Sequence, residues 1–249
     1  MNWSPFSAVL FDLDGVITPT AVVHRHAWTE MFDEFLAERG DQPPFTDADY
    51  VDFVDGKPRT DGVRSFLASR DIELPEGEPD DPPSAQSVAG LGTRKNLRFN
   101  EILERDGVTA YPGSVALIDA LADTDLELAI VSSSRNARQV LSAAGLLDRF
   151  EVIVDGVVGG GANLAGKPAP DYFLHAAAQV GCTPATAVVI EDAISGVAAG
   201  AAGDFALVIG VDRGAGADAL RAVGAHVVVE DLAELLPTDP SVEPEQARR

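Results

Sequence analysis

Short apolar runs alternate with helical patterns over much of the chain. Runs typical of strands cover residues 8–11, 126–131, 152–154, 187–190, 205–211 and 226–229. Apolar residues at helical spacing lie between several of them, over residues 135–144, 171–180 and 194–202. Strands that alternate with helices are typical of a parallel sheet covered on both faces. The pattern therefore predicts an α/β fold.

A block of helical patterns separates the first predicted strand from the others. Helical spacing covers residues 20–40, 48–54, 60–69 and 87–105, and an acidic, proline-rich stretch at 74–83 predicts a loop. Since the first strand most simply joins the later ones in one sheet, the block is an insertion. We predict a core of residues 1–17 and 108–237, a helical insertion of residues 18–107 and a disordered tail of residues 238–249.

The first predicted strand ends in two acidic residues. Asp12 and Asp14 follow the apolar residues 8–11, and Gly15 closes the run. In open α/β sheets, ligands bind at the carboxyl ends of the strands. A carboxylate pair in a half-buried crevice is costly unless a cation neutralises it, and oxygen-only ligands suit Mg²⁺. The stretch thus predicts a Mg²⁺ site in which one aspartate is free to act as a nucleophile.

The alternative is a turn whose acids cap the next helix. The same spacing recurs at Asp47/Asp49 and at Asp123/Asp125, where no apolar run precedes it and the charges look solvated. The spacing alone is therefore uninformative. The prediction depends on the strand, the acid pair and the glycine together.

Three later motifs follow predicted strands or precede predicted helices. In Ser132-Ser133-Ser134-Arg135-Asn136, hydroxyls and backbone N–H groups at a helix start form an anion site, unless Ser134 is only an N-cap. Lys167 stands in a loop stiffened by Pro168 and Pro170, where it would neutralise a nucleophilic carboxylate and a phosphoryl group; the alternative is a surface lysine. Glu191 and Asp192 close the strand at 187–190, which predicts four acids around one crevice.

Composition narrows the possible partners and compartment. The 249 residues include 40 acidic and 18 basic ones, so the net charge is −22, which disfavours binding to nucleic acid or membranes. No secretory signal or membrane span is recognised, and Cys182 is the only cysteine, so we expect a cytoplasmic protein. A soluble monomer is the default expectation for so acidic a chain.

The motifs resemble those of a known superfamily. Asp12-Leu13-Asp14-Gly15-Val16, Ser132, Lys167-Pro168 and Glu191-Asp192 resemble, in order and spacing, the four motifs of the haloacid dehalogenase (HAD) superfamily. The resemblance extends over about residues 8–236. It implies a Rossmann-like, HAD-like parallel core with a small helical cap domain inserted after the first strand.

A narrower resemblance is to the β-phosphoglucomutase-like group of that superfamily. His24 and Trp28 follow the first motif at that group's spacing, and Gly56-Lys57-Pro58-Arg59 and Arg94-Lys95-Asn96 resemble its basic cap segments. Two positions depart from the group: Pro19 stands where an aspartate is common, and Ala193 where many relatives have serine. Because proline fixes φ, the departure at Pro19 bears on how the core and cap are hinged.

The resemblance implies a role for each residue. Asp12 would be the nucleophile that forms an aspartyl-phosphate, and Asp14 would act as general acid and then base. The Mg²⁺ would be held by the backbone carbonyl of Asp14 and by the side chains of Asp12, Glu191 and Asp192. The remaining residues would bind the phosphoryl oxygens or the substrate: Ser132, the Ser133 backbone and Lys167 at the reacting phosphoryl group, with Ser134, Asn136, Gly56, Trp28, Arg59 and Lys95 around the substrate.

The resemblance also sets the functions to be compared. A mutase would convert β-D-glucose 1-phosphate to glucose 6-phosphate through glucose 1,6-bisphosphate, and it needs a distal phosphate site at Arg59 and Lys95 and a closed cap that excludes water. His24 would couple closure to the alignment of Asp14; the alternative is that His24 and Trp28 are cap-core residues that pack with Phe32 and Phe35, and this alternative is favoured for Trp28. A phosphatase acting on small sugar phosphates needs only the core, and a non-catalytic phosphate sensor is the third possibility.

Overall fold

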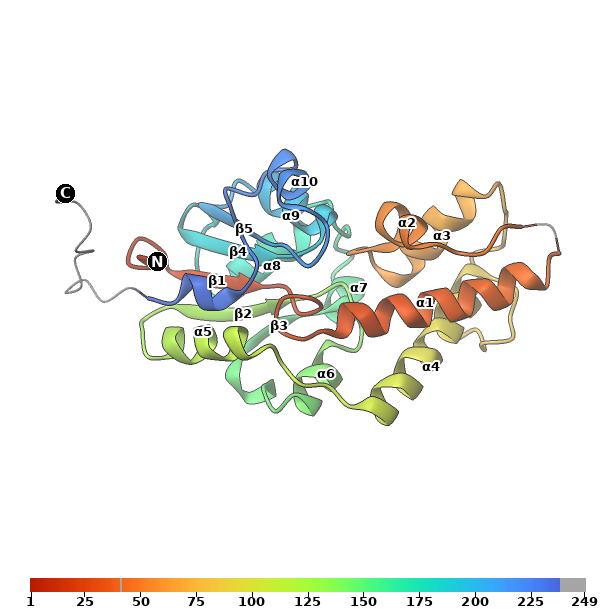
Figure 1. Ribbon diagram of the computed structural model, residues 1–249, viewed down its shortest axis with the longest axis horizontal. Coiled ribbons are helices and arrows are strands. Elements are labelled where there is room, and N and C mark those ends of the chain that lie inside the picture. Colours follow the sequence, from red (N-terminus) through yellow and green to blue (C-terminus); the bar gives the residue numbers. More distant parts are fainter. Residues whose placement is uncertain (41, 238–249) are drawn as a thin grey trace, which may run out of the picture.

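A parallel sheet of six strands forms the centre of the larger part of the molecule (Figure 1). The computed structural model describes residues 1–40 and 42–237. The strands lie in the order β3-β2-β1-β4-β5-β6, and all neighbouring pairs are parallel. Their bounds are Ala8–Phe11 (β1), Glu127–Val131 (β2), Val152–Val154 (β3), Ala187–Glu191 (β4), Leu207–Val211 (β5) and Val227–Val229 (β6). The predicted α/β class is confirmed.

The first strand lies in the middle of this sheet. Phe11 of β1 is in register with Ile130 of β2 and with Ile190 of β4. The N–H of Asp12 donates to the carbonyl of Ile190 over 2.9 Å, which extends the pairing one residue beyond the strand. The strand order reverses between β1 and β4, and such a switch point is where open α/β sheets bind ligands.

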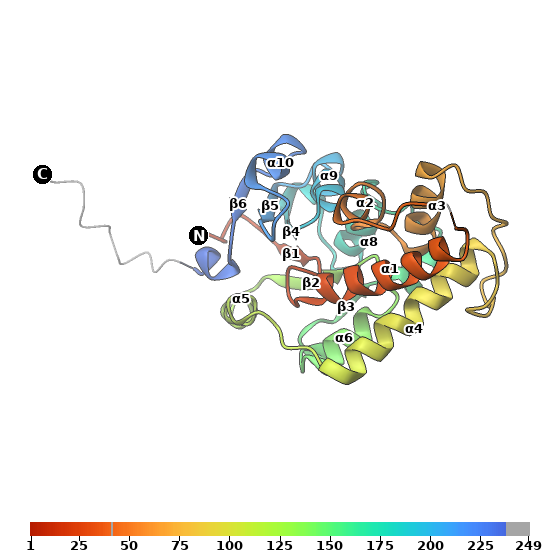
Figure 2. The same ribbon diagram turned by 45° about the vertical axis from the view of Figure 1, so that its right-hand side comes forward.

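Helices cover both faces of the sheet (Figure 2). Val9 and Phe11 of β1 pack in one apolar cluster, whereas Ala8 and Leu10 pack in the other, as the alternation of side chains along a strand requires. The first cluster contains side chains of α5 (Pro112–Ala122), α6 (Ala137–Ala143) and the end of α4 (Val88–Asp106). The second contains side chains of α8 (Asp171–Gln179), α9 (Ile194–Ala202) and α10 (Ala217–Ala222).

The helical insertion lies beside the sheet and has an apolar cluster of its own (Figure 1). Its elements are α1 (Thr20–Ala37), α2 (Asp47–Asp49), a π-helix η1 (Tyr50–Val54), α3 (Arg59–Ser69) and α4 (Val88–Asp106). Phe32 stacks on Trp28 and Phe45 at ring-centroid distances of 5.3 and 5.1 Å and also packs on Phe66. The division into core and insertion stays a prediction, and the predicted tail at 238–249 lies outside the described residues.

Several local predictions need correction. The helix predicted over residues 48–54 is a short α2 followed by a π-helix, α1 ends at Ala37 instead of residue 40, and α6 begins at Ala137 instead of residue 135. Three helices were not predicted: α5, α7 (Gly156–Gly161) and α10. Glycine fills four of the six positions of α7, so its propensity is poor, and Asp155 starts it by accepting hydrogen bonds from the N–H groups of Val157 and Val158.

The described residues also contain three short 3₁₀ segments. The 3₁₀ segments are η2 (Leu147–Arg149), η3 (Pro184–Thr186) and η4 (Leu232–Leu235). Across residues 1–40 and 42–237, none of the helices combines the length and the apolar character needed to cross a membrane.

We expect Leu10→Ala to destabilise the protein strongly. Leu10 is fully buried at the centre of β1, so its truncation leaves a cavity between the sheet and α8 and costs about 2–5 kcal/mol of the free energy of unfolding. Leu174→Ala is the matched control, because this leucine of α8 is 38% exposed and its truncation should cost only about 0.5 kcal/mol. Urea unfolding of both variants measures the difference, and equal losses would contradict the assigned burial.

Candidate active site

A pocket opens where the carboxyl ends of β1 and β4 face the helical insertion. The core contributes acidic residues and the segment after β2, whereas the insertion contributes α1, the loop after η1 and part of α4. The lining residues that were predicted from the sequence are Asp12, Asp14, His24, Trp28, Gly56, Arg59, Lys95, Ser133, Ser134, Asn136, Glu191 and Asp192. Ser132 and Lys167, also predicted, are buried beneath this lining. The structure thus brings the predicted residues together around one pocket.

Lys167 joins the two strand ends. Its ammonium lies 2.6 Å from Oδ1 of Asp12 and 2.5 Å from Oε1 of Glu191, and it is only 3% exposed. The interpretation of Lys167 as a surface lysine is therefore wrong. The second oxygen of Glu191 accepts the N–H of Ala193 over 2.7 Å, so both oxygens of this carboxylate have protein partners.

Neighbouring charges set the protonation states of Lys167 and Asp12. Burial alone would lower the pKa of Lys167, but Asp12 and Glu191 raise it, so the ammonium stays protonated. Burial raises the pKa of Asp12, the Lys167 ammonium lowers it, and the negative charges of Glu191 and Asp14 raise it again, with a net increase. One ammonium is therefore too little positive charge for the acids gathered here.

Asp14 is oriented differently from Asp12. Its Oδ1 accepts the hydroxyl of Thr20 over 2.5 Å and lies 3.3 Å from Nε2 of His24, and its Oδ2 accepts the hydroxyl of Ser132 over 3.2 Å. Burial would raise the pKa of Asp14, but His24 and the hydrogen bonds lower it to about 2. This carboxylate is therefore ionised at neutral pH.

His24 links Asp14 to a buried lysine. Its ring stacks on Phe99 at a centroid distance of 4.2 Å, and Nδ1 contacts the ammonium of Lys95. Burial and the nearby Lys95 lower the pKa of His24, and burial together with Arg59 lowers the pKa of Lys95 to about 7. His24 therefore both packs on aromatic residues and touches Asp14, and its coupling role stays a prediction. Trp28 likewise packs in the insertion while its ring lines the pocket.

The segment after β2 makes contacts in two directions. The hydroxyl of Ser132 accepts the N–H of Ser134, and the hydroxyl of Ser133 donates to the carbonyl of Gly56 in the insertion over 2.7 Å. The amide of Asn136 donates to Asn96 of α4 over 2.7 Å. The segment therefore faces the pocket and also fastens the insertion to the core.

The pocket lining also contains basic residues. Arg59 donates to the carbonyl of Gly92 over 3.1 Å, and burial together with the nearby Arg135 lowers its pKa to about 10. Arg135 was not among the predicted site residues, although it stands inside the serine-rich motif. Asp55 and Tyr50 also line the pocket and had no sequence signal, because only the fold brings η1 to the strand ends.

The donor set fits a divalent cation in its charge and chemistry. Burial and the charges of Glu191 and Asp55 raise the pKa of Asp192, whose carboxylate lies against Gly15; a Cβ at Gly15 would stand 1.9 Å from its Oδ2, and the φ of +94° also favours glycine. Buried oxygen donors with excess negative charge are what such an ion neutralises. Among the described residues, no three His, Cys, Asp or Glu side chains already converge as a preformed metal site.

Comparisons with known proteins agree with this geometry. The model of the haloacid dehalogenase-like hydrolases matches residues 6–204. The chain belongs to this family. A β-phosphoglucomutase of Mycobacterium bovis is 54% identical over 92% of this chain and 91% of its own length, and the E. coli hexitol phosphatase A is 32% identical over 78% and 77%. The crystal structure of a β-phosphoglucomutase from Clostridium difficile superposes with a TM-score of 0.75 at 24% identity, covering 92% of this chain and 93% of that one, and it supports the fold.

The resemblance to the β-phosphoglucomutase-like group of the HAD family is thereby confirmed. Membership implies a divalent cation and a small phosphorylated substrate. The roles of the individual residues stay predictions.

We expect Lys95 to make the stability of the apo protein depend on pH. Its native pKa of about 7 lies below the ordinary value of 10.5, so between these values the unfolded chain holds a proton that the native protein has released. The free energy of unfolding therefore rises with pH in this window, by about 1.4 kcal/mol per pH unit from this group. Lys95→Met removes the contribution, so the wild type should gain on the variant as the pH rises. Urea unfolding without metal or phosphate measures it, and parallel pH curves would contradict the burial of this ammonium.

Proposed function

We propose that the protein is a Mg²⁺-dependent β-phosphoglucomutase that converts β-D-glucose 1-phosphate to glucose 6-phosphate through an aspartyl-phosphate and glucose 1,6-bisphosphate. One observation carries the proposal. Two separate sets of residues at the pocket suit phosphate groups: Asp12 with Lys167 at the strand ends, and Arg59 with Arg135 in the lining. A sugar bisphosphate needs both sets, whereas a monophosphate that is only hydrolysed needs one. The 54% identical relative of the same length class supports the same activity.

Asp12 is the proposed nucleophile. Its Oδ1 is held by Lys167, so Oδ2 is the oxygen left to attack phosphorus. Lys167 would also stabilise the oxygens of the transferring group, since it is charged and excluded from water. When bound, Mg²⁺ would supply further charge stabilisation, held by Asp12, Glu191, Asp192 and the carbonyl of Asp14.

Asp14 is the proposed proton carrier. Its pKa of about 2 keeps it ionised. Once glucose 1,6-bisphosphate has phosphorylated Asp12, Asp14 takes the proton of the C6 hydroxyl of β-glucose 1-phosphate as that oxygen attacks phosphorus and the bond from phosphorus to Asp12 breaks. The bisphosphate formed then presents its other phosphate to Asp12. Asp14 returns the proton to the C1 oxygen as its bond to phosphorus breaks. Counted from phosphorylated Asp12, Asp14 is a base and then an acid; counted from the phosphorylation of Asp12 by the bisphosphate, the same cycle has the acid-then-base order that the resemblance implies.

Closure of the insertion would keep water from the aspartyl-phosphate. The contacts of Ser133 with Gly56 and of Asn136 with Asn96 join core and insertion around the pocket and support this role. We also propose that the protein works in the cytoplasm, which its single cysteine supports, and as a monomer, which the net charge of −22 supports.

The second candidate is a phosphatase acting on small sugar phosphates. It would use the same core residues, and the 32% identical hexitol phosphatase A supports it as an alternative. The two differ in where the phosphoryl group goes, to a sugar hydroxyl or to water.

Product analysis separates these two functions. Given β-glucose 1-phosphate, Mg²⁺ and a trace of glucose 1,6-bisphosphate, we expect mostly glucose 6-phosphate, measured by a coupled dehydrogenase assay alongside free phosphate. Mostly free phosphate would overturn the mutase proposal, and no product of either kind would favour a sensor. In the control variant Asp12→Asn we expect no turnover and an unchanged fold; retained activity would exclude Asp12 as the nucleophile.

We expect Arg59→Ala to reduce isomerisation selectively. Losing charge-assisted hydrogen bonds to the distal phosphate should lower kcat/KM for the mutase reaction about 100-fold. Hydrolysis of acetyl phosphate, which has no second phosphate, should change less than about threefold by the same argument. The matched control is Arg64→Ala in the same helix, whose guanidinium pairs with Glu76 away from the pocket. Equal losses in both reactions would place Arg59 outside distal-phosphate binding.

A further inference from the structure

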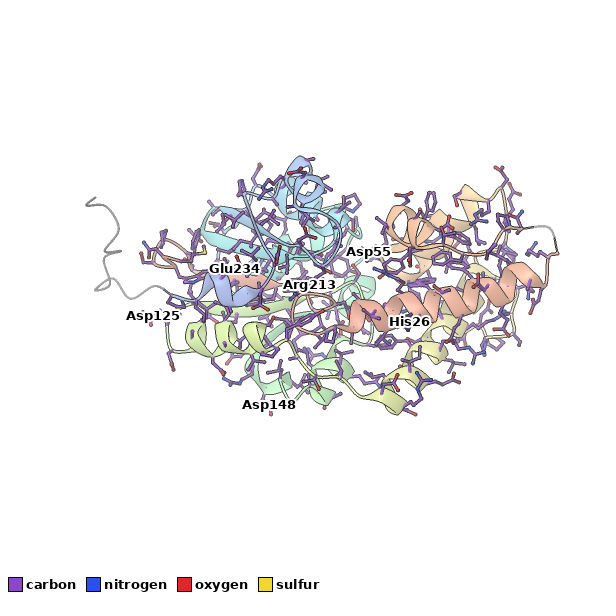
Figure 3. All side chains as sticks on the ribbon, in the orientation of Figure 1. His26, Asp55, Asp125, Asp148, Arg213 and Glu234 are labelled. Carbon is purple, nitrogen blue, oxygen red and sulfur yellow. The ribbon has the colours of Figure 1, made fainter. Side chains whose placement is uncertain are left out.

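Asp55 is a carboxylate whose place in the pocket the proposed reaction does not use. It follows η1 and lies where the helical insertion meets the core (Figure 3). It lines the pocket together with the acids at the strand ends and the basic residues of the lining. An anion at this point repels phosphate, so its presence in a site for phosphorylated substrates calls for another ligand group.

The backbone at Asp55 is fixed against the core. The hydroxyl of Ser195 on α9 donates to the carbonyl of Asp55 over 3.0 Å, and the hydroxyl of Ser133 donates to the next carbonyl, that of Gly56, over 2.7 Å. A Cβ at Gly56 would stand 2.1 Å from the Ser195 hydroxyl oxygen, and the φ of Gly56 is +71°. The loop therefore sits on the core with no room for a larger residue, which gives the Asp55 side chain a defined position.

The side chain of Asp55 lies near Tyr50, which is itself held in place. Burial and the charge of Asp55 raise the pKa of the Tyr50 hydroxyl. Tyr50 is 4% exposed, and the guanidinium of Arg25 lies over its ring, 5.1 Å from the centroid. Within the described part of the chain, no Lys, Arg or His side chain forms an ion pair with Asp55. A carboxylate without an ion pair keeps acceptor capacity for a donor of a ligand.

These observations limit the ligand group by its chemistry. An ionised carboxylate only accepts hydrogen bonds, so its partner must be a donor, and the partner must not be a phosphate. In a hexose bisphosphate the phosphates occupy C1 and C6, and the groups between them are the hydroxyls at C2, C3 and C4. Asp55 lines the same pocket and forms an ion pair with neither Arg59 nor Lys167, so these ring hydroxyls are donors that remain available to it.

We propose that Asp55 accepts a hydrogen bond from a ring hydroxyl of the sugar and thereby makes the enzyme select polyhydroxylated substrates. The identity of the sugar rests on the proposed function, whereas the hydroxyl contact does not. A site built to hydrogen-bond a substrate hydroxyl rejects an analogue that lacks it, because the buried acceptor is left without a partner.

The test combines Asp55→Ala with substrates that lack one hydroxyl. We measure kcat/KM of wild type and variant for β-glucose 1-phosphate and for its 2-, 3- and 4-deoxy analogues. The wild type should lose about 100-fold with the analogue that lacks the contacted hydroxyl. Asp55→Ala should lose a similar factor with the full sugar and nothing further with that analogue. Hydrolysis of acetyl phosphate, which has no ring hydroxyl, should change less than about threefold for the same reason.

Three further variants serve as controls for charge, loop position and side-chain shape. Asp52→Ala removes an exposed carboxylate from the same π-helix and should leave every ratio unchanged. Ser195→Ala loosens the loop, so it should affect the full sugar and all analogues equally. Asp55→Asn keeps the shape of the side chain and one neutral acceptor; it should show an intermediate, position-specific loss, and it preserves the test where the alanine variant fails to fold.

The outcomes distinguish this proposal from the proposed function. For each analogue, the loss caused by Asp55→Ala could multiply with the loss caused by the missing hydroxyl. If it does so for all three analogues, Asp55 contacts none of these hydroxyls and the proposal is overturned. An equal loss with acetyl phosphate would assign Asp55 to the fold or the metal site and would overturn it as well. If the wild type releases free phosphate instead of glucose 6-phosphate, the proposed mutase function is wrong. The comparison of wild type and Asp55→Ala across the deoxy analogues, measured as phosphate release, still tests the role of Asp55.

Discussion

The buried ammonium of Lys167 between two carboxylates is the interaction on which the site depends. It joins the end of β1, the end of β4 and the loop before α8, three segments that are far apart in the sequence. Removing one partner of such a buried group leaves an unpaired charge, which typically costs about 3–5 kcal/mol. The sheet tolerates the group because it lies at the switch point, where the strand ends open toward ligands. Burying these three charged residues therefore costs folding free energy, while the proposed chemistry needs the same three residues.

The two aspartates of the first motif have different electrostatic environments because they face different neighbours. Asp12 points to Lys167 in the core, whereas Asp14 is held by Thr20 and His24 at the start of the helical insertion. The position of α1 consequently contributes to the orientation and the low pKa of Asp14. A movement of the insertion would remove the contacts with Thr20 and His24 while leaving Asp12 and the Ser132 contact in place, which is the physical basis for the proposed link between closure and proton transfer.

The sequence predicted best the site residues that lie at the ends of strands or helices. Asp12, Lys167 and Glu191 each follow or precede a regular element, so the parallel sheet alone brought them together. Asp55 and Arg135 could not be assigned in this way, because their neighbours come from the packing of the insertion on the core. The π-helix at Tyr50–Val54 was also missed, since its periodicity differs from that of the α-helix on which the prediction relied.

The two departures from the group's pattern are accommodated by their immediate neighbours. Pro19 precedes α1 with a φ of −75°, which a proline adopts without strain, and it does not supply a side-chain cap to the helix. Ala193 offers only its backbone, whose N–H orients Glu191. In this part of the chain the hydroxyl that reaches the insertion is that of Ser195, two residues further along in α9, and it holds the backbone of Asp55. With a small side chain at residue 193, the contact is made by the hydroxyl at residue 195, and it fixes the backbone of a carboxylate that no motif of the family marks.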